Sequence, residues 1–218
     1  MKLLLTSAGL ENKIIRDFAT SQISEFKSKT VGVIITGQTA EERIYIDQSL
    51  KELRDLGMTT ISMNISKDDN FNDLAEFDMY YVCGGNTFYI LDRIRKTGVD
   101  NILLKAIKKD KLYIGVSAGS IIMAKNIKTA NVGKDGDDNE IGLKDISGFN
   151  IIPFHFFPHY DETEKEAVEE FYKTEQEPIM ALTDDQAIFI DDDSYILIGN
   201  KGGIQMDVNF NNKTINYD

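Results

Sequence analysis

The residues best suited to chemistry in this chain surround Ser117, in the Gly-Val-Ser-Ala-Gly pattern of residues 115–119. An apolar run of residues 112–116 leads into the pattern, and a second apolar run follows it. Glycines two positions before and two after a serine remove the side chains that would clash at a sharp turn between a strand and a helix. Such a turn presents the hydroxyl at the end of the strand, so the sequence predicts Ser117 as a nucleophile.

A serine nucleophile needs a base, and the chain contains only two histidines, His155 and His159. Imidazole suits this task because its pKa lies near the operating pH. Residues four apart point the same way in an extended chain, so spacing alone does not choose between the two. His159 is preferred because it follows Pro158 at the boundary with an acidic, loop-like stretch, where active-site residues project from strand ends. His155 is expected to be a buried histidine with satisfied hydrogen bonds.

Two other chemistries have less support in the sequence. Cys83, the single cysteine, precedes a glycine pair at a predicted strand end, but no histidine is near it in the sequence. A buried small residue explains this cysteine better than a second nucleophile does. A zinc site built on both histidines lacks a compact third ligand in phase with them. We therefore expect neither a metal nor a cofactor.

The elements that must position these residues alternate between strand-like and helix-like runs. This alternation predicts an α/β fold, in which a mostly parallel sheet forms the middle of three layers with helices on both faces. The expected strands are residues 2–6, 30–36, 59–64, 79–83 and 112–116, and the expected helices are residues 11–26, 40–56, 88–97 and 101–108. Short runs follow at 179–182, 187–190, 195–199 and 204–209, separated by Asp, Asn and Gly turns, and we expect antiparallel edge strands there. The length and composition predict a single domain over residues 1–218.

The charge balance narrows the choice of partners. The chain has 36 acidic and 24 basic residues and a formal net charge of -12, which opposes binding to nucleic acid or to an anionic membrane. The N-terminal apolar run is too short for a signal peptide, and no later stretch could span a bilayer. A single cysteine fits a reducing compartment. We expect a cytoplasmic protein, a monomer or homodimer, that acts on a small or cationic substrate.

Three segments in order carry a resemblance to a known family. They are Tyr-Val-Cys-Gly-Gly-Asn-Thr-Phe at 81–88, Tyr-Ile-Gly-Val-Ser-Ala-Gly at 113–119 and Phe-Pro-His-Tyr at 157–160. Together they resemble the dipeptidase E and cyanophycinase family of serine peptidases, and the resemblance covers nearly the whole chain. It implies a flavodoxin-like sheet related to class I glutamine amidotransferases, with a serine where those enzymes carry a cysteine. It also implies intracellular hydrolysis of peptides that begin with aspartate.

The resemblance assigns roles to individual residues of this chain. It implies that Ser117 is the nucleophile and that His159, in the Pro-His-aromatic motif, is its base. It also implies that the backbone N–H groups of Gly85 and Ala118 form the oxyanion hole.

The third member of the triad is the point where the sequence departs from the family. The family usually carries a glutamate downstream of the histidine, near an apolar strand, and residues 181–188 fill that place here. Alignment of the apolar residues 187–188 puts Asp184 at the glutamate position. Aspartate can orient an imidazole as glutamate does, although its side chain is one methylene shorter. Asp185 is the alternative acid, and Asp135, in a loop that some members draw on, is another.

The substrate is less well defined than the chemistry. A peptidase that requires an N-terminal aspartate needs a cation to pair with the aspartate side chain, and arginine does this best. The stretch 161–170 contains no arginine, and Lys165 is flanked by acids and expected on a solvated helix face. The net negative charge of the chain suits a substrate whose N-terminal residue is cationic or unblocked. The alternatives are a cyanophycinase-like or isoaspartyl-type peptidase, and a non-catalytic binding protein on the same fold.

Overall fold

The computed structural model of the chain describes residues 1–22, 28–67, 71, 76–199, 202–208 and 213–215. The strands are Lys2–Thr6 (β1), Thr30–Ile35 (β2), Thr59–Asn64 (β3), Met79–Val82 (β4), Leu112–Val116 (β5), His155–Phe157 (β6), Ile179–Ala181 (β7), Gln186–Asp191 (β8), Ser194–Gly199 (β9), Ile204–Met206 (β10) and Lys213–Ile215 (β11). The α-helices are Lys13–Gln22 (α1), Ala40–Asp55 (α2), Thr87–Lys96 (α3), Val99–Lys108 (α4), Ala118–Ile121 (α5) and Lys165–Glu175 (α6), and the short 3-10 helices are Lys128–Asn131 (η2) and Glu162–Glu164 (η3).

Within the described residues, eight strands form the main sheet in the order β11-β9-β8-β1-β5-β4-β2-β3. The five strands from β1 to β3 in this order are parallel neighbours. Counted from the β3 edge, strands β3, β2, β4 and β5 take the places of strands 2, 1, 3 and 4 in the flavodoxin order, and β1 follows beside β5. Because parallel strands run in one direction, the carboxyl ends of β1, β2, β4 and β5 meet at one edge of the sheet, where α/β proteins bind their ligands.

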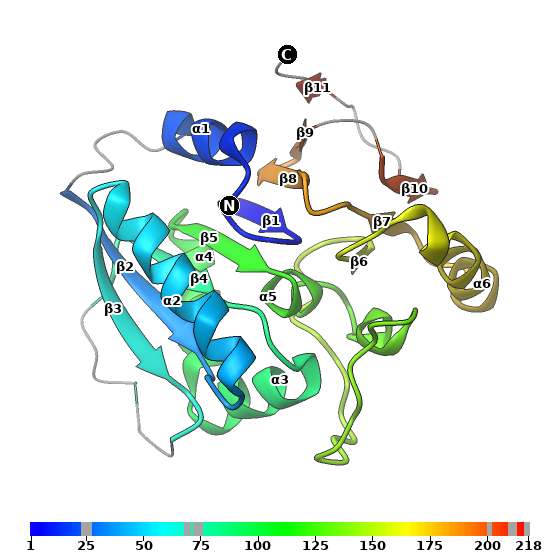
Figure 1. The fold of residues 1–218 in the computed structure, drawn as a ribbon, viewed down its shortest axis with the longest axis horizontal. Helices are drawn as coiled ribbons and strands as arrows, with labels where there is room; N and C mark the ends of the chain where they lie inside the picture. Colours follow the sequence, from blue (N-terminus) through cyan, green and yellow to red (C-terminus); the bar gives the residue numbers. More distant parts are fainter. Residues whose placement is uncertain (23–27, 68–70, 72–75, 200–201, 209–212, 216–218) are drawn as a thin grey trace.

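Helices cover both faces of this sheet (Figure 1). On one face, α1 and α2 pack against Leu4 of β1 and Tyr81 of β4. On the other face, α3, α4 and α5 pack against Leu3 and Leu5 of β1 and Val82 of β4. Side chains of a strand alternate between the faces, so a strand buried on both sides is apolar along its whole length. The burial of β1 and β4 explains their unbroken runs of apolar residues.

A second, smaller sheet lies beside the first and has the strand order β10-β7-β6 (Figure 1). Strands β6 and β7 are parallel, with Phe157 opposite Ala181. Helix α6 covers this sheet through Val168 and Phe171. Because β6 and β7 are parallel neighbours, the segments that follow them leave the sheet side by side.

The structure confirms the expected α/β class and the antiparallel strands β8 and β9. Segments 179–182 and 204–209 were expected at the edge of the main sheet, but their strands β7 and β10 belong to the second sheet, and β7 is parallel to β6. Hydrophobic periodicity predicts a strand without indicating its neighbour. The helix after Ser117 is only the four residues of α5, and α1 ends at Gln22, with residues 23–26 of the predicted helix outside the described ones. In the part of the chain that the structure describes, no helix is long and apolar enough to cross a membrane.

Candidate active site

Ser117 occupies a sharp turn between β5 and α5 with unusual backbone angles, φ 48° and ψ -108°. A positive φ is uncommon for a residue with a side chain, and such strained residues gather at active sites. Hydrogen bonds hold the turn on both sides: the Ser117 N–H donates to Thr6 O at 2.9 Å, and Ser117 O accepts from Ser120 N at 2.8 Å. The surrounding structure therefore fixes the serine at the carboxyl edge of the main sheet.

The two glycines of the pattern are required by close backbone contacts. A Cβ atom on Gly115 would lie 2.6 Å from Gly119 O, and one on Gly119 would lie 2.5 Å from Val82 O. Both distances are far below van der Waals contact. The helix after Ser117 therefore packs directly onto the ends of β5 and β4, which is the geometry that the glycine spacing predicted.

His159 and Asp184 meet because they follow the parallel strands β6 and β7. The connection is tightened by two backbone hydrogen bonds, Leu182 N to Phe157 O at 2.9 Å and Tyr160 N to Leu182 O at 3.0 Å. His159 Nδ1 lies 2.7 Å from Asp184 Oδ1. An ionised carboxylate only accepts hydrogen bonds, so Nδ1 is the donor and Nε2 is left to accept a proton.

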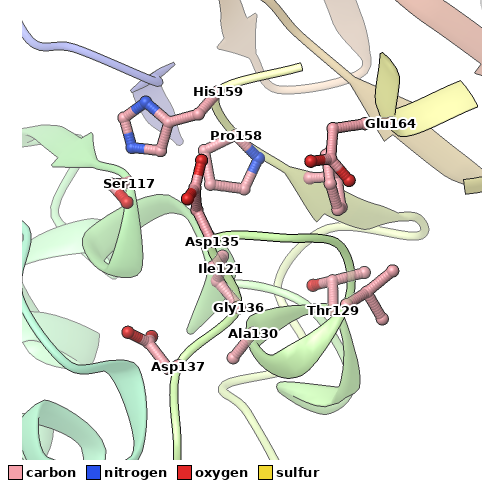
Figure 2. Close-up of a pocket in the computed structure, with 12 residues that line it drawn as sticks. Ser117, Ile121, Thr129, Ala130, Asp135, Gly136, Asp137, Pro158, His159 and Glu164 are labelled. Atoms are coloured by element: carbon pink, nitrogen blue, oxygen red, sulfur yellow. The ribbon is translucent and has the colours of Figure 1, made fainter. Parts of the chain in front are cut away.

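The imidazole faces the serine across the mouth of a pocket. Figure 2 shows the ring of His159 above Ser117, with one ring nitrogen on the side of the serine hydroxyl. Both residues line the same cleft. No hydrogen bond joins their side chains among the described residues, and such catalytic hydrogen bonds are often long until substrate binds. The side chains of His159 and Asp184 are 47% and 61% exposed, so the hydrogen bond between them adds little to stability.

The two residues expected to form the oxyanion hole are Gly85, which lines this cleft, and Ala118, which is fully buried. Gly85, at φ 136°, follows the end of β4, and Ala118 directly follows the serine. In the described part of the chain, neither N–H donates a hydrogen bond to another residue. The turn after Gly85 is fixed by Asn86, whose side chain accepts from Tyr89 N at 3.0 Å and caps α3.

The two alternative acids have other surroundings. Asp185 Oδ1 accepts a hydrogen bond from Asn12 Nδ2 at 2.7 Å. Asp135 lines the cleft beside His159, and no hydrogen bond joins it to that histidine among the described residues. Asp184 is thus the acid that contacts the imidazole of His159.

The remaining residues singled out from the sequence lie elsewhere. His155 is 2% exposed, and its Nε2 lies 2.8 Å from Glu177 Oε2, as expected for a buried histidine. Its Nδ1 has no hydrogen-bond partner, however.

Cys83 is 4% exposed, and burial raises the pKa of its thiol to about 12, which excludes a reactive thiolate at neutral pH. Lys165 is exposed at the start of α6 and does not line the cleft. No three His, Cys, Asp or Glu residues are arranged to hold a metal ion in the described part of the chain.

The cleft in front of Ser117 has a volume of about 850 Å³ and is lined by many carboxyl groups that sequence reasoning did not assign to the site. They come from helix α2 and from the loops after β1 and η2, and are Glu11, Glu41, Glu42, Glu52 and Asp137. Asp137 Oδ2 accepts from Thr87 N at 2.8 Å. The pKa of Asp137 is raised, mainly by burial and further by the charge of Glu42. No local signal marks these residues, because segments distant in the sequence bring them together.

Comparison with known proteins assigns the chain to a family. The model of Peptidase family S51 matches residues 3–198. The chain belongs to Peptidase family S51. This S51 protein is 32% identical to Lmo0363, an uncharacterized peptidase of Listeria monocytogenes, over 77% of this chain and 84% of that one. It is 27% identical to a peptidase E of Shewanella denitrificans, over 92% of this chain and 88% of that one.

A solved structure agrees with this membership. A crystal structure of a candidate peptidase E protein from Listeria monocytogenes EGD-e has a TM-score of 0.77 with this S51 chain, at 30% sequence identity. The similarity covers 92% of this chain and 98% of that one. The protein is therefore a serine-type peptidase with the α/β fold of that structure.

Proposed function

We propose that Ser117, His159 and Asp184 are the catalytic triad of this S51 peptidase and that the enzyme hydrolyses short peptides. The observation that supports the proposal best is the 2.7 Å hydrogen bond between His159 Nδ1 and Asp184 Oδ1 in the cleft of Ser117. These side chains come from the ends of three strands in two sheets. A purely structural need for this convergence is not evident, because the histidine and the acid are both exposed.

The proposed reaction has two halves. Ser117 Oγ attacks the carbonyl carbon of the peptide bond while His159 Nε2 takes the hydroxyl proton, and Asp184 stabilises the imidazolium through Nδ1–H. His159 then gives the proton to the leaving amine, and the C–N bond breaks to leave an acyl-serine. In the second half, water replaces the amine, His159 takes its proton, and the carboxylic acid leaves as the serine regains its proton.

The oxyanion of each tetrahedral intermediate would accept hydrogen bonds from Gly85 N–H and Ala118 N–H. Preorganised donors of this kind contribute about 3 kcal/mol each to transition-state stabilisation. Both groups are held by the elements that hold Ser117, since α5 begins at Ala118 and the Gly85 turn follows β4, the neighbour of β5. The chain thus supplies every group that the proposed reaction uses.

Other parts of the functional assignment stay proposals. The acidic surface supports a small substrate and no nucleic acid or anionic membrane as partner, and the free, buried Cys83 is consistent with a cytoplasmic location. A single peptidase domain and a monomer or homodimer remain the expected organisation. Cyanophycinase-like or isoaspartyl-type cleavage would use the same triad on a different peptide bond. Two observations disfavour a non-catalytic binding protein: the strained backbone of Ser117 and the hydrogen bond between His159 and Asp184.

The test is hydrolysis of a panel of X-Leu dipeptides, with Asp, Glu, Lys or Ala as X, by the purified enzyme and its Ser117→Ala variant. We expect the substitution to lower kcat by at least about a thousandfold on whichever dipeptide is cleaved. Ser194→Ala, which removes an exposed hydroxyl at the start of β9, is the matched control and should leave kcat unchanged. Equal turnover by the Ser117→Ala variant would contradict the assignment of the nucleophile.

A further inference from the structure

A narrow extension of the cleft runs from Ser117 and His159 toward η3, and Figure 2 shows Glu164 on the side opposite the serine. Its walls between these two ends combine polar residues, among them Thr129, Asp135 and Asp137, with an apolar part. The apolar part is formed by Ile121, Ala130, Val132, Phe157 and Pro158. The extension thus offers an apolar wall surface between the serine and the carboxylate of Glu164.

Glu164 is a buried carboxylate, only 5% exposed, and it keeps hydrogen-bonding capacity. Its oxygens share one donor, the Lys134 N–H, at 3.2 and 3.4 Å. Two carboxylate oxygens offer about four acceptor positions, so several remain. A buried charge that is incompletely paired attracts a cation strongly, because water screens it poorly.

The nearest cation is already engaged with other groups. Lys134 Nζ lies 3.9 Å from Glu164 Oε1, but it donates hydrogen bonds to Asp161 Oδ2 at 2.8 Å and to Thr163 Oγ1 at 3.1 Å. The charge of Lys134 is therefore balanced by Asp161, and the carboxylate of Glu164 adds a net negative charge at this end of the pocket.

The rest of the cleft has the same sign of charge. Asp135 and Asp137 line both the extension and the wide cleft. Neither lysine nor arginine is among the described residues that line these two spaces. An aspartate side chain bound beside Ser117 would meet these carboxylates without a cation to pair with.

We propose that this extension is a specificity pocket for a cationic N-terminal residue, lysine or arginine, with Glu164 as the group that receives its charge. The apolar walls cover the methylene stem, and the carboxylate accepts hydrogen bonds from the charged end, an arrangement that suits an amphipathic side chain. The inference rests on the proposed function, because the scissile carbonyl must lie at Ser117 for the side chain to enter the pocket.

Binding tests the pocket without catalysis. In the Ser117→Ala background, calorimetry gives the Kd of Lys-Leu, of Asp-Leu and of norleucine-Leu, which keeps the stem of lysine and lacks its charge. We expect Lys-Leu to bind at least about tenfold more tightly than either of the others. Equal Kd values, or tighter binding of Asp-Leu, would overturn the pocket whether or not any further variant folds.

Glu164→Gln tests the residue, because glutamine has the same shape and can still accept from Lys134 N–H. The variant should lose most of the preference for Lys-Leu and bind norleucine-Leu as before. Glu170→Gln removes the same charge from an exposed position of α6 and should keep the preference. A Glu164→Gln variant that weakens all three peptides equally would show a structural role and overturn the assignment.

Turnover separates this inference from the proposed function. Steady-state hydrolysis of the same peptides by the enzyme with Ser117 intact should follow the order of the Kd values. A preference for Lys-Leu in binding without serine-dependent turnover would overturn the proposed reaction and uphold the pocket. Serine-dependent turnover with no preference for Lys-Leu would overturn the pocket and uphold the proposed reaction.

Discussion

Asp184 and Asp185 are neighbours in the sequence, yet they have different partners in the structure. Asp184 contacts the imidazole of His159, whereas Asp185 accepts a hydrogen bond from Asn12. Both residues lie in the turn between β7 and β8, and this turn directs their side chains to different partners. The pair is therefore a natural comparison for the role of the acid.

We expect Asp184→Asn to lower kcat by about 10³ to 10⁴, because an amide that donates to Nδ1 favours the wrong tautomer of His159. The measurement is kcat for the best dipeptide, compared with the same reaction of Asp185→Asn. The second variant should keep kcat within about threefold, since its amide oxygen can still accept from Asn12. If the two variants reverse this order, Asp185 is the acid of the triad.

At the scale of elements, the short helix η3 joins the histidine segment to α6 and depends on Asp161. Asp161 caps η3 by accepting from Thr163 N at 2.7 Å, and Lys134 Nζ donates to it at 2.8 Å. The hydrogen bond from Lys134, followed by those from Thr163, lowers the pKa of the Asp161 carboxyl from 3.8 to about 2. The unfolded chain thus binds this proton more tightly than the folded protein does.

The contribution of Asp161 to stability is therefore complete above pH 3.8 and lost as the pH falls through about 2. We expect the urea midpoint of Asp161→Asn to lie below that of the parent protein near neutral pH, and the difference to shrink as the pH falls from about 4 toward 2. The measurement is the urea midpoint of both proteins across this range. Glu162→Gln is the control, because the side chain of Glu162 makes no hydrogen bond or ion pair among the described residues. A difference that stays constant with pH would contradict the argument.

At the scale of the whole molecule, the sheet is buried on both faces. The reactivity of the Cys83 thiol measures whether one of these faces is still covered. Cys83 follows β4 and belongs to the core formed with α1 and α2. Its thiol has a pKa of about 12 because burial disfavours the thiolate. A thiol in this position reacts only after the layer above the sheet opens.

We expect iodoacetamide to leave Cys83 and the peptidase activity unchanged in native buffer, and to label the thiol in urea as the chain unfolds. Mass spectrometry of samples quenched at increasing urea concentrations measures the labelled fraction, and its midpoint should match that of far-UV circular dichroism. Rapid labelling in native buffer, with loss of activity, would instead identify Cys83 as accessible and close to the reaction.

The sequence by itself determined the layered fold and the turn at Ser117, because both depend on local patterns. Alternating strand and helix periods predict a covered parallel sheet, and the glycine spacing predicts a close turn whose contacts are now visible at Gly115 and Gly119. The roles of Ser117, His159 and Asp184 stay predictions, although the tertiary structure brings the three side chains to one cleft.

Only the tertiary structure decided which strands pair and which charged side chains lie close together. The parallel pairing of β6 and β7 brings the segments that carry His159 and Asp184 side by side. The acidic cleft joins Glu42 of α2 to Asp137 and Glu164 from segments far along the chain. Sequence periodicity shows how a segment turns about its own axis, but it carries no information on which distant segment lies beside it.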